Sequence, residues 1–98
     1  MRMLMKCTMD LEAGNAAIKS GEMGKKMGKI METLKPEAVY FTSMGGKRTV
    51  LIFLDMVDSA QMPIFAEPMF MDLKAEVEFM PAMTPAELHK GLGQLSKG

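Results

Sequence analysis

The sequence predicts one α+β domain over residues 1–98, in which an antiparallel sheet carries helices on one of its faces. Along the chain, segments in which every second residue is apolar alternate with segments whose apolar residues recur at helical spacing. Two adjacent glycines, Gly45 and Gly46, lie between two strongly apolar segments, which is typical of a tight hairpin. The length of 98 residues, with 48% hydrophobic and 24% charged residues, is that of a single folded domain.

The first two elements are a strand and an amphipathic helix. In residues 2–9 one face of the strand is wholly apolar, with Met3, Met5, Cys7 and Met9. Residues 15–34 place apolar side chains on one side and most of their charges elsewhere, as a helix docked on a sheet does. Three glycines weaken this helix, so we expect its early part to be irregular, and Pro36 ends it.

A hairpin follows the helix. Residues 38–43 have the β-branched and aromatic side chains of a strand, and the Met44-Gly45-Gly46-Lys47 segment forms the turn. Residues 49–56 return as a strand that is apolar on both faces, because Leu51 and Phe53 oppose the apolar set Val50, Ile52, Leu54 and Met56. This returning strand is therefore expected at the centre of the sheet.

The last three elements are a helix, a strand and a short terminal helix. Asp58 is the expected N-cap of a helix that extends to about Met71, with a kink or two short pieces at its two prolines, Pro63 and Pro68. Residues 74–80 alternate as a strand, with Ala75, Val77 and Phe79 on one face. The Thr84-Pro85-Ala86-Glu87 segment predicts a capping box and a helix that ends between residues 92 and 95.

This order of elements is that of a ferredoxin-like βαββαβ fold with an extra C-terminal helix, in which both main helices cover the same face of the sheet. The other face is not polar, since it holds Leu51 and Phe53, joined by Leu4 and by Tyr40 or Phe41 according to the register. An exposed apolar patch of this kind usually marks an interface or a ligand groove. We therefore expect a homodimer in which two sheets pack face to face.

Five stretches of the sequence carry a resemblance to a known group: Glu12-Ala13-Gly14-Asn15-Ala16-Ala17, Leu34-Lys35-Pro36-Glu37-Ala38, Gly46-Lys47-Arg48-Thr49, Ala66-Glu67-Pro68-Met69-Phe70 and Met83-Thr84-Pro85. Over nearly its whole length the chain resembles a family of short, functionally uncharacterised bacterial proteins in the dimeric α/β barrel superfamily. The resemblance implies two ferredoxin-like subunits that pair their sheets around a shared interior. It implies no particular activity, because the superfamily includes monooxygenases, isomerases, haem enzymes and proteins without known activity.

Charge and cysteine content argue against several partners. The 12 Lys and Arg residues balance the 12 Asp and Glu residues, so the chain has no basic field to attract nucleic acid and little repulsion between copies. Cys7 is the only cysteine and lies in an apolar run, which predicts a buried thiol and a reducing cytoplasm. The apolar residues near the N-terminus are too few for a signal peptide or a membrane span.

The candidate catalytic residues are two glutamates and a tyrosine. Glu76 and Glu78 share one strand face, where a carboxylate in a cavity can act as a general base, and Tyr40 can orient a substrate through its hydroxyl. The favoured interpretation of the glutamates is structural, because Lys6 on the neighbouring first strand is placed to form a cross-strand ion pair with either of them.

The candidate ligand-binding residues are Lys6, Leu51, Phe53 and Arg48. Arg48 and its neighbour Lys47 follow the hairpin turn and can bind an anionic group, although charges at a turn are usually solvated. His89 is the only histidine and has no metal-ligand spacing around it, so we expect an exposed helix residue there and predict neither a metal site nor a cofactor.

Three functions are compatible with this sequence. The leading hypothesis is a homodimeric domain that binds a small apolar ligand between the sheet and the helices. The sequence has 14 methionines, and walls rich in methionine suit an adaptable pocket. The alternative is a cofactor-light monooxygenase or isomerase of the dimeric α/β barrel type, which predicts a pocket containing Glu76, Glu78 or Tyr40. The third is a structural or regulatory subunit, which predicts a filled interior.

Overall fold

The computed structural model describes residues 1–95. These residues form one antiparallel sheet with helices on one face. The strands are β1 (Arg2–Thr8), β2 (Ala38–Met44), β3 (Lys47–Asp55) and β4 (Glu76–Pro81). The helices are α1 (Leu11–Lys19), α2 (Met23–Leu34), α3 (Gln61–Leu73) and α4 (Pro85–Leu95). With α1 and α2 counted as one connection, this is the predicted ferredoxin-like βαββαβ order followed by a C-terminal helix.

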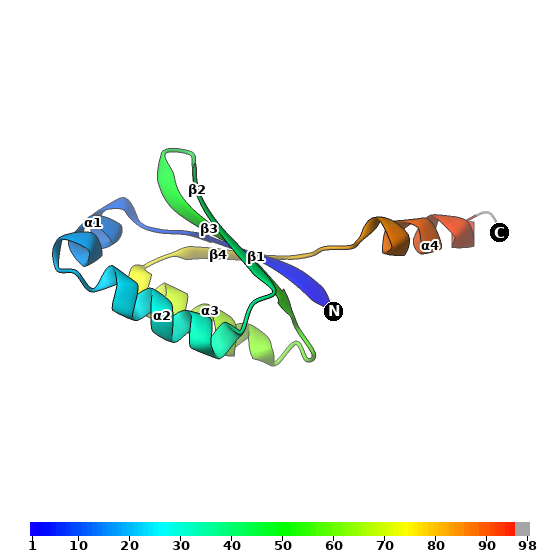
Figure 1. The fold of residues 1–98 in the computed structure, drawn as a ribbon, viewed down its shortest axis with the longest axis horizontal. Coiled ribbons are helices and arrows are strands. Elements are labelled where there is room, and N and C mark those ends of the chain that lie inside the picture. Colours follow the sequence, from blue (N-terminus) through cyan, green and yellow to red (C-terminus); the bar gives the residue numbers. More distant parts are fainter. Residues whose placement is uncertain (96–98) are drawn as a thin grey trace.

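The sheet has the strand order β2-β3-β1-β4, and every neighbouring pair is antiparallel. Strand β3 is therefore interior, as its apolar residues on both faces predict. Strands β2 and β4 form the two edges, and residues 40–44 of β2 are all exposed. Figure 1 shows α2 and α3 side by side on one face of the sheet, while the opposite face carries no helix from the described residues.

The β2–β3 hairpin forms at the predicted glycines. Gly45 and Gly46 have φ angles of 61° and 77°, a left-handed conformation that side chains with a Cβ rarely adopt. Two consecutive residues of this kind produce a turn whose twist matches that of the strands, and Met44 pairs directly with Lys47 across it. The hairpin is confirmed.

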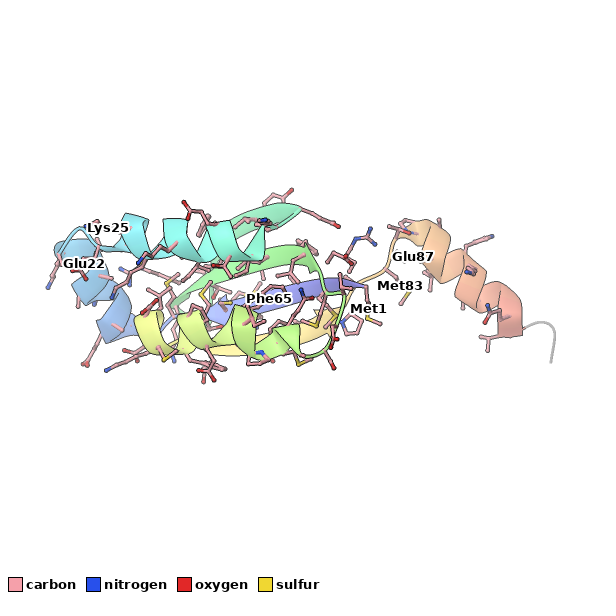
Figure 2. All side chains as sticks on the ribbon, turned by 90° about the horizontal axis from the view of Figure 1, so that it is seen from below. Met1, Glu22, Lys25, Phe65, Met83 and Glu87 are labelled. Carbon is pink, nitrogen blue, oxygen red and sulfur yellow. The ribbon has the colours of Figure 1, made fainter. Side chains whose placement is uncertain are left out.

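The core lies between the sheet and the helices α2 and α3. It is built by alternate strand residues in register, with Met5 opposite Ile52 and Cys7 opposite Val50. The helices add Ile30, Leu34, Phe65, Met69 and Leu73. Figure 2 shows the labelled Phe65 pointing from α3 toward the strands. Full burial of a side chain of this size stabilises the fold by about 1.5–3 kcal/mol.

Cys7 is fully buried in this core, and burial raises the pKa of its thiol to about 12 from 9.0. Between these two pH values the unfolded chain loses the thiol proton while the folded chain keeps it, so ionisation favours the unfolded state and stability falls as pH rises.

We therefore expect native protein to resist labelling by a thiol reagent at pH 8 and urea-unfolded protein to react rapidly. The free energy of unfolding, measured with urea between pH 8 and 10.5, should fall less steeply with pH in Cys7→Ala than in the wild type. An equal dependence on pH in the two proteins, or rapid labelling of the native protein, would contradict the expectation.

The prediction of one helix over residues 15–34 is wrong, because the structure has two helices there. Helix α1 begins earlier, since the Asp10 carboxylate accepts a hydrogen bond from the Ala13 N–H (2.9 Å) and caps the first turn. Helix α1 stops before Gly21, whose φ of 77° is incompatible with a continuing helix. The chain turns at Gly21, and α2 then runs along the sheet (Figure 1).

The expectation for this segment was a kink or two short pieces. Helix α3 is one continuous helix of 13 residues, which excludes the two short pieces. Pro63 is the third helical residue and lies in the first turn, where a backbone N–H has no acceptor within the helix. Pro68 lies inside the helix and removes one internal hydrogen bond, that to the Ile64 carbonyl.

The segment before α3 differs slightly from the predicted N-cap. Ala60, not Asp58, is the N-cap residue. The Asp58 carboxylate instead accepts a hydrogen bond from the Ala60 N–H (2.8 Å), and the Gln61 side chain accepts one from the Val57 N–H (2.8 Å). These two bonds fix the turn by which the chain enters the helix.

Strand β4 begins at Glu76 and not at position 74. Lys74 is the left-handed residue (φ 47°) that ends α3, so it cannot also extend the strand. The predicted alternation is confirmed, because Ala75 is buried and Val77 and Phe79 pack against the core.

Helix α4 begins with the predicted capping box. The Glu87 N–H donates to the Thr84 hydroxyl (3.2 Å), and the Thr84 N–H donates to the Glu87 carboxylate (2.8 Å). Arg2 of β1 donates to the same carboxylate (2.8 Å) and so links the start of the helix to the sheet. No residue of α4 is buried, and Figure 2 shows the helix standing away from the sheet beyond Met83.

Candidate functional site

A pocket of about 330 Å³ lies between α1, α2 and the β2–β3 hairpin. Its volume is at the lower end of the range of about 300–1,000 Å³ that is usual for small-molecule sites. The apolar side chains of its wall are Met9, Ile18, Met23, Met27, Phe41 and Val50. Thr42, Arg48 and Thr49 are the polar residues of the lining. This composition suits a small and mostly apolar molecule.

The break between α1 and α2 makes this pocket. Ile18 lies before the break and Met23 and Met27 lie after it, so the two helices form two separate walls. The floor is Val50 with Phe41, which pairs with it across the hairpin. Phe41 is 64% exposed although it shares the helix-covered face of the sheet, so the helices leave this corner of the sheet open.

Arg48 is the one charged residue in the lining of this pocket. It lies two residues before Val50 and therefore on the same face of β3, and its backbone carbonyl accepts a hydrogen bond from the Met9 N–H (2.9 Å). Its Nη1 atom is buried and has no hydrogen-bond partner among residues 1–95. Because a guanidinium keeps its proton in proteins, this atom remains a charged and unpaired donor.

Helix α1 makes room for Arg48 at Gly14. Gly14 is buried, and a Cβ atom at this position would lie 2.8 Å from Nη1 of Arg48. Any residue larger than glycine would therefore push the guanidinium out of its present position. Gly14 and Arg48 come from two different stretches among those on which the family resemblance is based, and the fold brings them into contact.

The helix-free face of the sheet holds the other predicted ligand-binding residues. Leu51 and Phe53 are partly exposed there. The register pairs Tyr40 with Leu51 and Leu4 with Phe53, so Tyr40 and not Phe41 belongs to this face. We call Leu4, Tyr40, Leu51, Phe53 and Met80 the open apolar face.

Lys6 lies on the same face, beside the candidate glutamates. It is paired with Glu78 across β1 and β4, and its Nζ atom is 3.5 Å from the Glu78 carboxylate. This is the predicted cross-strand ion pair. Glu76 lies two residues earlier, in a small polar pocket that it shares with Asp10, Lys47 and Lys74.

The three candidate catalytic side chains are not gathered into one site in this chain. Tyr40 is on the edge strand β2 and the glutamates are on the opposite edge strand β4, three strand spacings or about 14 Å away. Tyr40 is 63% exposed, and both glutamates are exposed. The arrangement contains no nucleophile with an adjacent base and no enclosed acid.

Sites of other kinds are not built by the described part of the chain. Within residues 1–95 no three His, Cys, Asp or Glu side chains are close enough together to hold a metal ion. His89 is exposed on α4, as predicted. None of the helices in these residues combines the length and the hydrophobicity that a membrane span requires.

Arg48 was predicted from the sequence as a candidate residue, but the residues around it were not. The pocket residues Ile18, Met23 and Met27 fall in the single helix predicted over residues 15–34, with an irregular early part, so no corner between two helices was expected. Two signals in the sequence point to the pocket: the Ser20–Gly21 segment as a helix end, and the even-numbered position of Arg48, which places it on the same strand face as Val50 and Ile52.

The comparisons with known proteins give no assignment. No protein-family model matches this chain, and neither a curated protein nor a solved structure matches it. Inference about function therefore depends on the pocket, on the open apolar face and on the chemistry of the residues in each.

Proposed function

We propose that this chain is a homodimeric domain that binds a small, largely apolar molecule in the pocket between α1, α2 and the β2–β3 hairpin. The observation that carries the proposal is the pocket itself, which stays open beside a core whose central side chains are fully buried. Three of its wall residues are methionines, and flexible thioether side chains adapt to ligands of different shapes. A pocket of this kind favours an apolar ligand over a highly charged one.

Two uncovered apolar surfaces support the homodimer. The first is the open apolar face, which no helix within residues 1–95 covers. The second is the row Leu88, Leu92 and Leu95 on α4, spaced so that all three lie on one side of the helix, and all three are exposed. A second copy of the chain offers a matching surface for both, and dimers of this type are what the resemblance to dimeric α/β barrels implies.

The size of the sheet explains why α4 would take part. Four strands of about six residues give a flat face of roughly 400 Å², whereas stable interfaces usually bury about 800 Å² on each partner. An isolated helix of 11 residues is also marginal in water. Packing of α4 against the partner would enlarge the interface and stabilise the helix.

The monooxygenase or isomerase alternative has no comparable support, because Tyr40, Glu76 and Glu78 lie on opposite edges of the sheet and outside the methionine-lined pocket.

The pocket is tested with the neutral fluorescent probe N-phenyl-1-naphthylamine. We expect saturable binding by the wild type and about fivefold weaker binding by Ile18→Gln, the effect of losing roughly 40 Å² of apolar contact at about 25 cal/mol per Å². Ile64→Gln is the matched control, because Ile64 is an isoleucine on α3 of similar exposure, 56% against 51% for Ile18, and lies outside the pocket lining.

Circular dichroism and thermal melting of both variants establish that the fold is retained. Failure of the wild type to bind the probe at high micromolar protein would contradict the proposal. Equal loss of binding in both glutamine variants would also contradict it, because the probe would then be bound at no particular place.

A further inference from the structure

We propose that Arg48 holds the carboxylate of the ligand, so that the natural ligand is an amphipathic monocarboxylic acid with a short aliphatic or aromatic tail. This inference rests on the proposed binding function and specifies the class of molecule bound. The observation behind it is a guanidinium whose Nη1 atom is buried at the wall of an apolar pocket without a hydrogen-bond partner in the described chain.

Arg48 as a whole is partly exposed, but its Nη1 atom is buried and lacks a hydrogen-bond acceptor within residues 1–95. A buried donor of a charged group that has no acceptor is unfavourable, and this donor cannot be removed, because a guanidinium does not lose its proton in proteins. The pocket lining contains no acidic residue. Of its hydroxyl groups, that of Thr49 is already used, because it donates to the Lys47 carbonyl (3.1 Å). The missing negative charge is therefore expected to arrive with the ligand.

The backbone of Arg48 is fixed, and α1 leaves space for its guanidinium. Arg48 is anchored through its carbonyl to the Met9 N–H, and Gly14 leaves the space that Nη1 occupies. A planar guanidinium binds a carboxylate through two parallel hydrogen bonds, which orients the acid and directs its tail along the neighbouring apolar wall.

The geometry favours a monoanion over a phosphate ester. A phosphate group has a charge of about −1.5 to −2 and three strong acceptor oxygens, which usually require several donors. This pocket provides one cation. The nearby N-terminus of α1 is not available as an additional anion site, because the Asp10 carboxylate already caps it by accepting from the Ala13 N–H.

The test compares octanoate with 1-octanol, which share a tail and differ in charge. Both are titrated by calorimetry or by displacement of N-phenyl-1-naphthylamine from the full-length protein. We expect the wild type to bind octanoate at least tenfold more tightly than octanol. Arg48→Gln should lose about tenfold to a hundredfold of its octanoate affinity and keep its octanol affinity. Lys47→Gln is the matched control, since it removes an exposed neighbouring cation, and it should retain the preference.

A second variant covers the case in which Arg48→Gln fails to fold. Gly14→Ala leaves the charge in the chain but places a Cβ atom 2.8 Å from the present position of Nη1, which forces the guanidinium to move, so the preference for octanoate should fall severalfold while the neutral probe still binds. Equal affinity of the wild type for octanoate and octanol would overturn the assignment, as would an unchanged preference in both variants. If the carboxylate assignment is overturned but the wild type still binds the neutral probe, the proposed function is retained. If the wild type binds none of these molecules, the proposed function and the carboxylate assignment are both rejected.

Discussion

Phe53→Glu should convert the proposed dimer to a monomer. Phe53 lies on the open apolar face, opposite Leu4 in the register, and two symmetry-related copies would each carry the change. Two unpaired carboxylates would be buried in one interface, which raises the dimer dissociation constant by about a hundredfold or more. Light scattering coupled to size exclusion at 1–50 μM protein gives the mass directly.

Met71→Glu is the matched control for this change. Met71 is also an exposed apolar residue, but it lies on α3 and hence on the helix-covered side of the molecule. The control should stay dimeric, and circular dichroism should show both variants folded. A wild type that is monomeric over this concentration range would reject the dimer, and a dimeric Phe53→Glu variant would show that the copies associate through another surface.

Ile52→Ala should cause a large loss of stability. Ile52 is adjacent to Phe53 but points the other way, and it has no exposed surface. It is fixed between Met5 and Val39 on the two neighbouring strands, so the space left by truncation cannot easily collapse. Substitutions of this kind lower the free energy of unfolding by about 2–5 kcal/mol. This is a large part of the total free energy of unfolding of a small domain, which is roughly 5–15 kcal/mol.

Urea unfolding at one fixed protein concentration measures this effect, because the stability of a dimer depends on concentration. We expect the midpoint to fall by about 1–2 M. Ile64→Ala, at an exposed position on α3, should shift the midpoint by no more than a few tenths of that amount. Similar shifts in the two variants would mean that the core between sheet and helices is not the main source of stability.

The elements that local chemistry specifies were predicted from the sequence. Two glycines at the hairpin, the capping box at Thr84 and the alternation along β3 each depend on residues within a few positions of one another. Such signals are complete within a short window, which is why the central position of β3 and the apolar character of both sheet faces could be inferred, whereas the pairing of the first strand with the last followed from the expected ferredoxin-like fold.

A methionine-lined pocket between the sheet and the helices was predicted, but its place in the fold was not, because that place depends on one backbone angle. Gly21 was counted as a weak helix former, but its positive φ angle ends α1 and lets α2 start in a new direction. A glycine can do either, and only the packing of the flanking helices decides which. The break between the helices and the position of the pocket were therefore missed for the same reason.

Arg48 shows a similar limit. Its position after a turn suggests a solvated charge. The alternation of side chains along β3, however, puts Arg48 on the same strand face as the buried residues Val50 and Ile52. The contact with Gly14, 34 positions earlier in the sequence, decides between the two, and a contact over that separation is not visible in local patterns.

The two edges of the sheet are not equivalent. The β4 edge carries Glu76 and Glu78 and ends in Pro81, so a further strand that approached it would meet negative charge and a residue without an N–H. The β2 edge, from Ala38 to Met44, has neither a charged residue nor a proline, and most of it is exposed. Intermolecular strand pairing, and with it any polymerisation of concentrated or heated protein, should accordingly start at β2.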